Sequence, residues 1–195
     1  MTSVRPTIWK SATELQHFLT EHGFRFCFIG GLAVQRWGEP RATKDVDVAL
    51  LTGFGTEQSY IRTILEQYAP RLEDAATFAI YSRVLLAEDH RGTPIDIALS
   101  GLPFEERAIE RSTPWGTPKG GRINTCSAED LIVFKAFASR PMDWNDIEAT
   151  LIRQGNRLDR NLILEELTPL AELKEEPEIL DRLNNLFRQH MNPDS

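Results

Sequence analysis

Cysteine is scarce in this sequence, since the 195 residues contain only Cys27 and Cys126. Two isolated cysteines cannot form a zinc site, and a disulfide scaffold would use more of them in a chain of this size. No segment approaches the roughly 18 consecutive apolar residues of a membrane span, and no apolar stretch follows the first residues to act as a secretion signal. We therefore expect a soluble protein of a reducing cytoplasm, without membrane contact.

Positive charge is in deficit, because 22 lysine and arginine residues stand against 29 aspartate and glutamate residues, a formal net charge of -7. Such a chain is not built for sequence-independent binding along phosphate backbones, which excludes a histone-like or sliding DNA-binding protein. Capture of a nucleic-acid end by a local basic patch is still compatible with this charge. Hydrophobic residues make up 41% of the chain, enough to bury a core and to exclude wholesale disorder.

Apolar periodicity divides the chain into two parts. Before residue 126, helical segments alternate with short apolar segments that predict strands. The predicted strands are 25–29, 45–51, 83–88, 95–99 and 122–125. Ser127 with Asp130 three residues later begins a helix in the manner of a capping box. The chain beyond it predicts helices over 128–138, 144–154, 160–173 and 178–190.

These segments predict an α/β (α+β) fold in two parts. Residues 1–126 would form a small, twisted mixed sheet with flanking helices. Residues 127–195 would form a C-terminal helical bundle that closes one side of a cleft.

Three aspartates stand out within the predicted strands. Asp45 and Asp47 alternate with Val46 and Val48, so both carboxylates should lie on one face of a strand while the valines point into the core. A solvated strand face is the alternative explanation for such a pair. Asp96, however, is a single charge within the apolar strand 95–99, where burial without a partner would be costly.

If the strand of Asp96 lies beside that of Asp45 and Asp47, the three carboxylates converge. Their mutual repulsion would then be relieved by a divalent cation. Three aspartates in this geometry suit the two Mg²⁺ ions of phosphoryl or nucleotidyl transfer.

A second feature is Gly30-Gly31, at the point where a predicted strand runs into a helix. Glycines let backbone N–H groups approach a phosphate closely, and the helix N-terminus favours negative charge. Turns also use paired glycines for purely structural reasons. The pair precedes Asp45 by fifteen residues, which makes it more specific, and the chain has no Walker-type phosphate loop.

Together these features resemble the DNA polymerase β-type nucleotidyltransferase superfamily. The residues concerned are Gly30-Gly31, the motif Arg41-x-Thr43-x-Asp45-x-Asp47, and Asp96. The segment 129–147 is similar to the helical part of the abortive-infection (AbiEii-type) nucleotidyltransferase toxins. The match spans roughly Phe26 to Glu148 and leaves the last part of the chain outside it.

The resemblance implies an enzyme that uses Mg²⁺ (or Mn²⁺) and a nucleoside triphosphate such as ATP. Asp45, Asp47 and Asp96 would bind the metals, and Asp96 would also help to activate the acceptor hydroxyl. The triphosphate would be bound by Gly30, Gly31, Arg41, Thr43 and Lys135. Asp146 would support the catalytic site from the next helix.

Several of these residues also have structural interpretations. Lys135 lies in an apolar helix, where a lysine often extends its ammonium to solvent. Because methionine keeps most of the apolar stem, we expect Lys135→Met to change fold stability little, and to raise the apparent KM for the nucleoside triphosphate if Lys135 is a ligand. A structural ion-pair cluster joining two helices would account equally well for Arg140, Asp143 and Asp146. Arg41 also has a structural interpretation, in which its positive charge only screens the negative charges of Asp45 and Asp47.

The sequence thus predicts a transferase that moves a nucleoside monophosphate from a nucleoside triphosphate to a hydroxyl or phosphate acceptor. The toxin-like acceptors are a tRNA 3′ end or a protein, with a cognate antitoxin as a further partner. The acidic charge favours the alternative of a small cationic antibiotic as acceptor. A third alternative, from a different class, is a non-catalytic nucleotide-binding or antitoxin-type interaction module.

Overall fold

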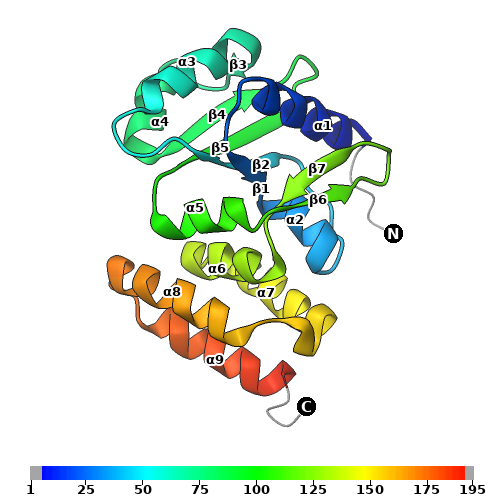
Figure 1. Ribbon diagram of the computed structural model, residues 1–195, viewed down its shortest axis with the longest axis vertical. Coiled ribbons are helices and arrows are strands. Elements are labelled where there is room, and N and C mark those ends of the chain that lie inside the picture. The colour runs from blue at the N-terminus through cyan, green and yellow to red at the C-terminus, as the bar shows by residue number, and fades with distance from the viewer. Residues whose placement is uncertain (1–5, 192–195) are drawn as a thin grey trace. The chain divides into compact units, whose positions relative to one another are not determined.

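Figure 1 shows the computed structural model, in which residues 6–191 are described. The chain divides into two units. Unit 1 consists of residues 1–32 and 41–126, and unit 2 consists of residues 33–40 and 127–195. The helical unit therefore includes a short segment from within the N-terminal part of the sequence.

Unit 1 contains a seven-stranded mixed sheet with the strand order β3-β4-β5-β2-β1-β7-β6. The strands are β1 (Phe26–Phe28), β2 (Val46–Leu51), β3 (Ala69–Pro70), β4 (Val84–Glu88), β5 (Pro94–Ser100), β6 (Thr113–Gly116) and β7 (Arg122–Thr125). In the centre of the sheet, β2 is antiparallel to β1 and parallel to β5. The predicted mixed α/β fold is confirmed.

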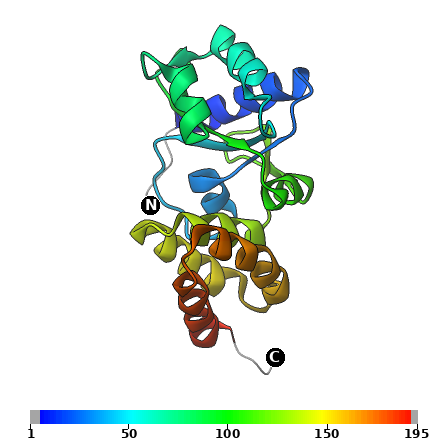
Figure 2. The same cartoon turned by 90° about the vertical axis from the view of Figure 1, so that its left-hand side faces the viewer.

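Helices cover both faces of this sheet. They are α1 (Pro6–Glu21), α2 (Gly30–Trp37), α3 (Glu57–Gln67), α4 (Ala75–Ser82) and α5 (Pro103–Glu110). Figures 1 and 2 show α1, α3 and α4 on one face and α5 on the other. The main core lies between the sheet and helices α1, α3 and α4, where Val46, Val48, Ile95 and Ile97 are fully buried.

The alternation of side chains along β2 and β5 decides which face of the sheet carries the aspartates. Because Val46, Val48, Ile95 and Ile97 enter the core under α1, α3 and α4, the residues between them point to the opposite face. Asp47 and Asp96 belong to that opposite set and are partly exposed.

Three elements of unit 1 were not predicted from the sequence: β3, α4 and β6. The strand β3 is two residues long and includes Pro70, and β6 includes Pro114. Proline is tolerated there because β3 and β6 are the two edge strands of the sheet. Helix α4 is apolar on most of its surface and so lacks the one-sided pattern that identifies a helix.

Unit 2 is built from α6 (Ala128–Ala138), α7 (Pro141–Gln154), α8 (Arg160–Lys174) and α9 (Glu178–His190), with a 3₁₀ turn at Gly155–Arg157. Ser127 caps α6 as predicted: its Oγ accepts a hydrogen bond from the backbone N–H of Asp130 at 3.0 Å and donates one to the Asp130 carboxylate at 2.8 Å.

The segment 33–40 belongs to unit 2 because α7 binds its backbone. Gln154 Nε2 donates a hydrogen bond to the Trp37 carbonyl at 2.5 Å, and Arg153 donates one to the Gly38 carbonyl. Gly38 also packs closely, since a Cβ at this position would lie 3.0 Å from Thr150 Oγ1.

Among the described residues, no helix is long and apolar enough to cross a membrane.

Candidate active site

Asp47 and Asp96 are brought together by the pairing of β2 with β5. The two strands are parallel, and the register places Asp47 directly opposite Asp96. Both side chains lie on the face opposite the main core, because their neighbours in each strand are buried in it. The convergence predicted from the alternation of the two strands is therefore present in the structure.

Asp45 joins the same group from just before β2. The strand begins at Val46, so Asp45 lies in a bend and not in the regular strand. The buried Thr43 holds it, because Thr43 Oγ1 donates a hydrogen bond to Asp45 Oδ1 at 2.9 Å. One carboxylate oxygen from each of Asp45, Asp47 and Asp96 lies within 4.8 Å of the others. We call these three residues the acidic cluster.

Gly30 and Gly31 begin α2 directly beside the acidic cluster. An ideal Cβ on Gly30 would lie well inside contact distance of the Asp47 carboxylate, and one on Gly31 would meet the Thr43 hydroxyl in the same way. Gly30 also has a φ of +53°, which favours glycine. The backbone N–H of Gly31 donates a hydrogen bond to Asp47 Oδ2 at 3.2 Å. The glycine pair thus allows the close packing of Asp47 and Thr43, a requirement that exists before any nucleotide binds.

The acidic cluster has the chemistry of a site for a hard divalent cation. It offers three carboxylate oxygens at close range, and Mg²⁺ and Mn²⁺ prefer oxygen ligands. All three side chains are partly exposed, so coordination positions can remain for water or for substrate oxygens. The residues present therefore fit Mg²⁺ or Mn²⁺.

Arg71 is a residue of this site that sequence analysis did not identify. Its guanidinium forms an ion pair with the Asp96 carboxylate, and the two side chains are 26% and 31% exposed. A single arginine following Pro70 carries no motif that would distinguish it. The contact depends on a pairing of strands that are distant in sequence.

The predicted nucleotide-binding residue Arg41 lies in the segment before β2. Its guanidinium donates a hydrogen bond to the adjacent Ala42 carbonyl at 3.4 Å. Its assignment to the triphosphate stays a prediction, as do those of Gly30, Gly31 and Thr43.

Lys135 and Asp146 belong to unit 2, where they form part of a buried ion-pair cluster. Lys135 Nζ lies 2.9 Å from Asp143 Oδ1 and 2.7 Å from Asp146 Oδ2, and Arg140 Nε lies 2.9 Å from Asp143 Oδ2. The Lys135 side chain is 7% exposed, so its ammonium does not extend to solvent. The structure therefore contains the ion-pair cluster that was the alternative interpretation of these residues. A role of Lys135 or Asp146 in catalysis stays a prediction.

Burial of Lys135 changes the expected effect of Lys135→Met. Removing the ammonium takes a buried cation away from the carboxylates of Asp143 and Asp146, of which Asp143 keeps its contact with Arg140. Loss of one partner from a buried ion pair typically costs about 3–5 kcal/mol. We expect urea denaturation to show a loss of this size, and not the small change expected from the sequence. The triple variant Lys135→Met/Asp143→Asn/Asp146→Asn removes all three charges and should recover part of the loss. Equal stability of Lys135→Met and the unmodified protein would contradict the burial.

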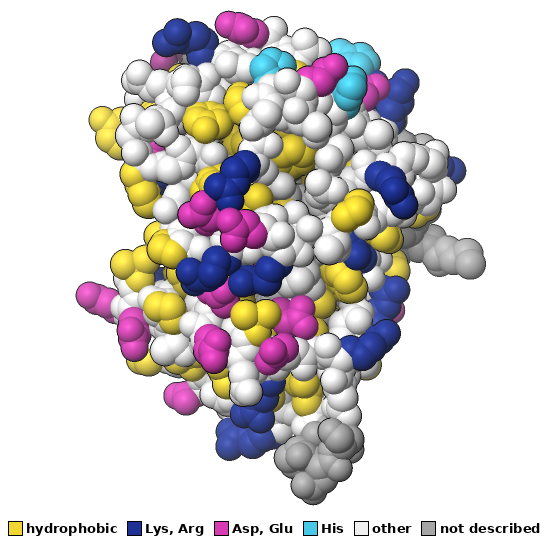
Figure 3. Space-filling view, in the orientation of Figure 1, with side chains coloured by type: hydrophobic (Ala, Val, Ile, Leu, Met, Phe, Trp, Pro, Cys, Tyr) yellow, Lys and Arg dark blue, Asp and Glu magenta, His cyan; other side chains and the backbone are white. Residues whose placement is uncertain are grey.

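A second group of possible cation ligands in unit 1 consists of Glu14, Asp89 and His90. Figure 3 shows histidine side chains gathered at this end of the molecule. Arg91 already supplies positive charge here, since its guanidinium pairs with Glu14 and with Asp89 at 2.8 Å. Burial acts to raise the pKa of Asp89, but hydrogen bonds from Ser11, Thr93 and Arg91, with the Arg91 charge, hold it below its usual value. We interpret the group as a structural ion-pair network that anchors the β4–β5 turn to α1.

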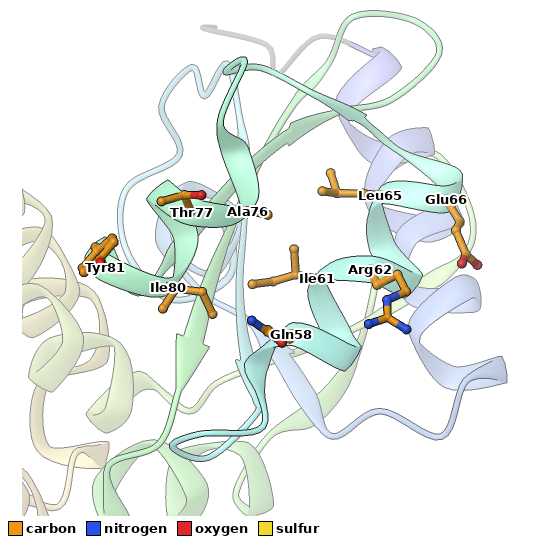
Figure 4. A pocket seen from close by; sticks show the side chains of 9 residues that line it. All are labelled: Gln58, Ile61, Arg62, Leu65, Glu66, Ala76, Thr77, Ile80 and Tyr81. Carbon is orange, nitrogen blue, oxygen red and sulfur yellow. The ribbon is translucent and has the colours of Figure 1, made fainter.

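An apolar pocket of about 740 Å³ lies between α3 and α4 (Figure 4). Its lining includes Ile61, Leu65, Ala76, Ile80 and Tyr81, and none of the acidic cluster. The two helices cover the sheet face opposite the carboxylates. This pocket is therefore separate from the candidate active site.

No protein-family profile and no curated protein sequence matches the chain. Among solved structures, it is similar to an antigenic nucleotidyltransferase-like protein from Paracoccidioides brasiliensis, with a TM-score of 0.53 and 12% identity over 94% of this chain and 95% of that chain. It is also similar to ANT(2'')-Ia in complex with adenylyl-2''-tobramycin, with a TM-score of 0.49 and 15% identity over 86% of this chain and 98% of that chain. The first of these likenesses shows the fold, which is that of a nucleotidyltransferase-like protein.

Proposed function

We propose that this protein is a metal-dependent nucleotidyltransferase. The observation that carries the proposal is the acidic cluster, in which three carboxylates converge beside Gly30 and Gly31 on one face of the sheet. Three like charges at this distance repel one another, and a protein that needed only a stable sheet would gain by replacing them. The nucleotidyltransferase-like fold agrees with this chemistry.

In the proposed site, Asp45, Asp47 and Asp96 hold Mg²⁺ or Mn²⁺. When bound, the metal neutralises charge on the triphosphate and on the attacking and leaving oxygens. Thr43 and the Gly31 N–H fix the orientation of Asp45 and Asp47 through the hydrogen bonds described above. These two contacts keep the carboxylates ready to bind the metal without a large rearrangement, which is the purpose of supporting hydrogen bonds around metal ligands.

The chain's remaining part in the reaction is to orient the substrates. The start of α2 presents backbone N–H groups, where a phosphate is favoured by the helix dipole. Asp96 orients the acceptor hydroxyl and accepts its hydrogen bond. As the acceptor oxygen forms a bond to the α-phosphorus, the hydroxyl proton passes to the Asp96 carboxylate, the bond from that phosphorus to the bridging oxygen breaks, and pyrophosphate leaves.

The class of acceptor is the finer part of the proposal. A toxin-like acceptor, meaning a tRNA 3′ end or a protein, and a cognate antitoxin partner are supported only by the resemblance of the segment 129–147. The net charge of -7 favours a cationic antibiotic instead. Both acceptors use the same chemistry at the acidic cluster, so one experiment can distinguish them.

The experiment is incubation of the protein with each α-labelled nucleoside triphosphate and Mg²⁺, in parallel reactions with total tRNA, a cytosolic protein extract, an aminoglycoside or a lincosamide. We expect Mg²⁺-dependent transfer of label to one acceptor, abolished by EDTA. Transfer to tRNA or protein would support the toxin-like proposal, and transfer to a drug would support the antibiotic alternative. Nucleotide binding without transfer in any reaction would overturn the enzyme and support the interaction module.

A further inference from the structure

Arg71 lies in the same row across the sheet as two members of the acidic cluster. Asp47 on β2 is opposite Asp96 on β5, and Asp96 is in turn opposite Leu86 on β4. The backbone N–H of Arg71 donates to the Leu86 carbonyl at 3.1 Å, which continues the pairing of β3 with β4 by one residue. Residues opposite one another in a sheet project from the same face. Arg71 therefore projects from the face that carries the carboxylates.

The side chain of Arg71 extends past the position of Leu86 to reach Asp96. One terminal nitrogen of its guanidinium contacts Asp96 Oδ1. Its Nε is buried and has no hydrogen-bond partner. The guanidinium is thus held by one nitrogen and not by the two parallel hydrogen bonds of the strongest arginine–carboxylate pairs. Displacing the guanidinium from Asp96 therefore breaks a contact through one nitrogen and not through two.

We propose that Arg71 is the counter-ion of the acidic cluster in the metal-free protein, and that a divalent cation must displace its guanidinium from Asp96 in order to bind. The inference rests on the proposed function, because it takes the acidic cluster as the metal-binding site. It assigns to Arg71 a positioning role: the residue keeps the three carboxylates together while no cation is present.

The physical basis is competition for the same oxygen. A carboxylate oxygen whose lone pairs face a guanidinium is less available to a metal, and the single positive charge also lowers the negative potential of the cluster. The apparent dissociation constant of a ligand is raised by the fraction of protein that is competent to bind it. If Asp96 is released about one-tenth of the time, metal affinity is reduced about tenfold.

The test is a titration of the full chain with Mn²⁺ alone, without nucleotide, in which free Mn²⁺ is followed by electron paramagnetic resonance. We expect Arg71→Met to bind Mn²⁺ about tenfold more tightly than the unmodified protein. Arg71→Gln is a second neutral variant that retains polar atoms, and it should show the same change. In EDTA, both variants should melt at a lower temperature than the unmodified protein, and saturating Mn²⁺ should reduce this difference.

The matched control is Arg62→Met, because Arg62 is an exposed arginine on α3 of the same unit. It should bind Mn²⁺ as the unmodified protein does, which separates the local contact from the general loss of one positive charge. Equal or weaker Mn²⁺ binding in both neutral Arg71 variants would overturn the inference. If that result occurs while Asp45→Asn still abolishes Mn²⁺ binding, the proposed function survives and the role of Arg71 alone fails. Absence of Mn²⁺ binding in every protein would overturn the metal site itself.

Discussion

Asp45→Asn is expected to reduce nucleotidyl transfer at least about a thousandfold while leaving the protein folded. A loss of that size in kcat/KM corresponds to about 4 kcal/mol of transition-state stabilisation, as expected when a ligand shared by the metals is removed. The asparagine amide oxygen can still accept the hydrogen bond that Thr43 Oγ1 donates to Asp45. The substitution therefore removes one negative charge and keeps the local geometry.

The stability of this variant distinguishes a functional carboxylate from a structural one. Removing one of three close like charges relieves repulsion, so the metal-free Asp45→Asn protein should melt at the same temperature as the unmodified protein or higher. The rise in melting temperature that Mg²⁺ and a nucleoside triphosphate give the unmodified protein should disappear.

Differential scanning fluorimetry with and without ligands, together with the transfer assay, measures both effects. Asp74→Asn is the matched control, because Asp74 is an exposed aspartate of the same unit whose side chain does not cap the helix that follows it. This control should keep activity and ligand-dependent stabilisation. An Asp45→Asn protein that is inactive and also unfolded would show that Asp45 is structural.

Gly30→Ala is expected to have the second large effect, on folding and metal binding together. Alanine at a φ of +53° costs about 1–2 kcal/mol, and the added Cβ would overlap the Asp47 carboxylate, for which overpacking costs about 1–3 kcal/mol. We therefore expect a total loss of about 2–5 kcal/mol in the free energy of unfolding. Each kcal/mol lowers the melting temperature by roughly 2–4 °C in a chain of this length. Because Asp47 must move to make room, Mn²⁺ binding should weaken as well.

Gly23→Ala separates the two causes. Gly23 lies in the same unit and has a φ of +67°, but a Cβ there would have no neighbouring atom within 4 Å. It should therefore show the backbone cost alone and retain full Mn²⁺ binding. Thermal melts and Mn²⁺ titrations of the two variants measure the difference. Equal effects of the two substitutions would contradict the close packing of Gly30 against Asp47.

Local sequence patterns were sufficient for most of the regular structure. Alternation predicted that Val46 and Val48 are buried and that Asp47 lies on the other face, and the structure agrees. The serine cap predicted the start of α6, and helical periodicity predicted α9 with its correct bounds. These features depend on neighbours within a few residues, and a single sequence contains that information.

Other features depended on contacts between distant segments. The pairing of Asp47 with Asp96 requires β2 and β5 to be adjacent, although α3, β3, α4 and β4 separate them in sequence. Asp96 suggested such a partner only because it is one charge in an apolar strand. Nothing local indicated that Arg71 would reach it, or that residues 33–40 would join the helical unit.

The sequence by itself determined most of the strand and helix pattern, though not β3, α4 or β6, together with the face on which Asp47 lies and the presence of a glycine pair near the carboxylates. Only the tertiary structure decided three further points. The register of β2 with β5 sets the spacing of the acidic cluster, and the contact of Arg71 partly balances its charge. The fold also buries Lys135 in ion pairs with Asp143 and Asp146, whereas its predicted contact with the triphosphate stays a prediction. The physical reason is that alternation and capping act along the chain, whereas charge pairing depends on distance in space, which the sequence fixes only through the complete fold.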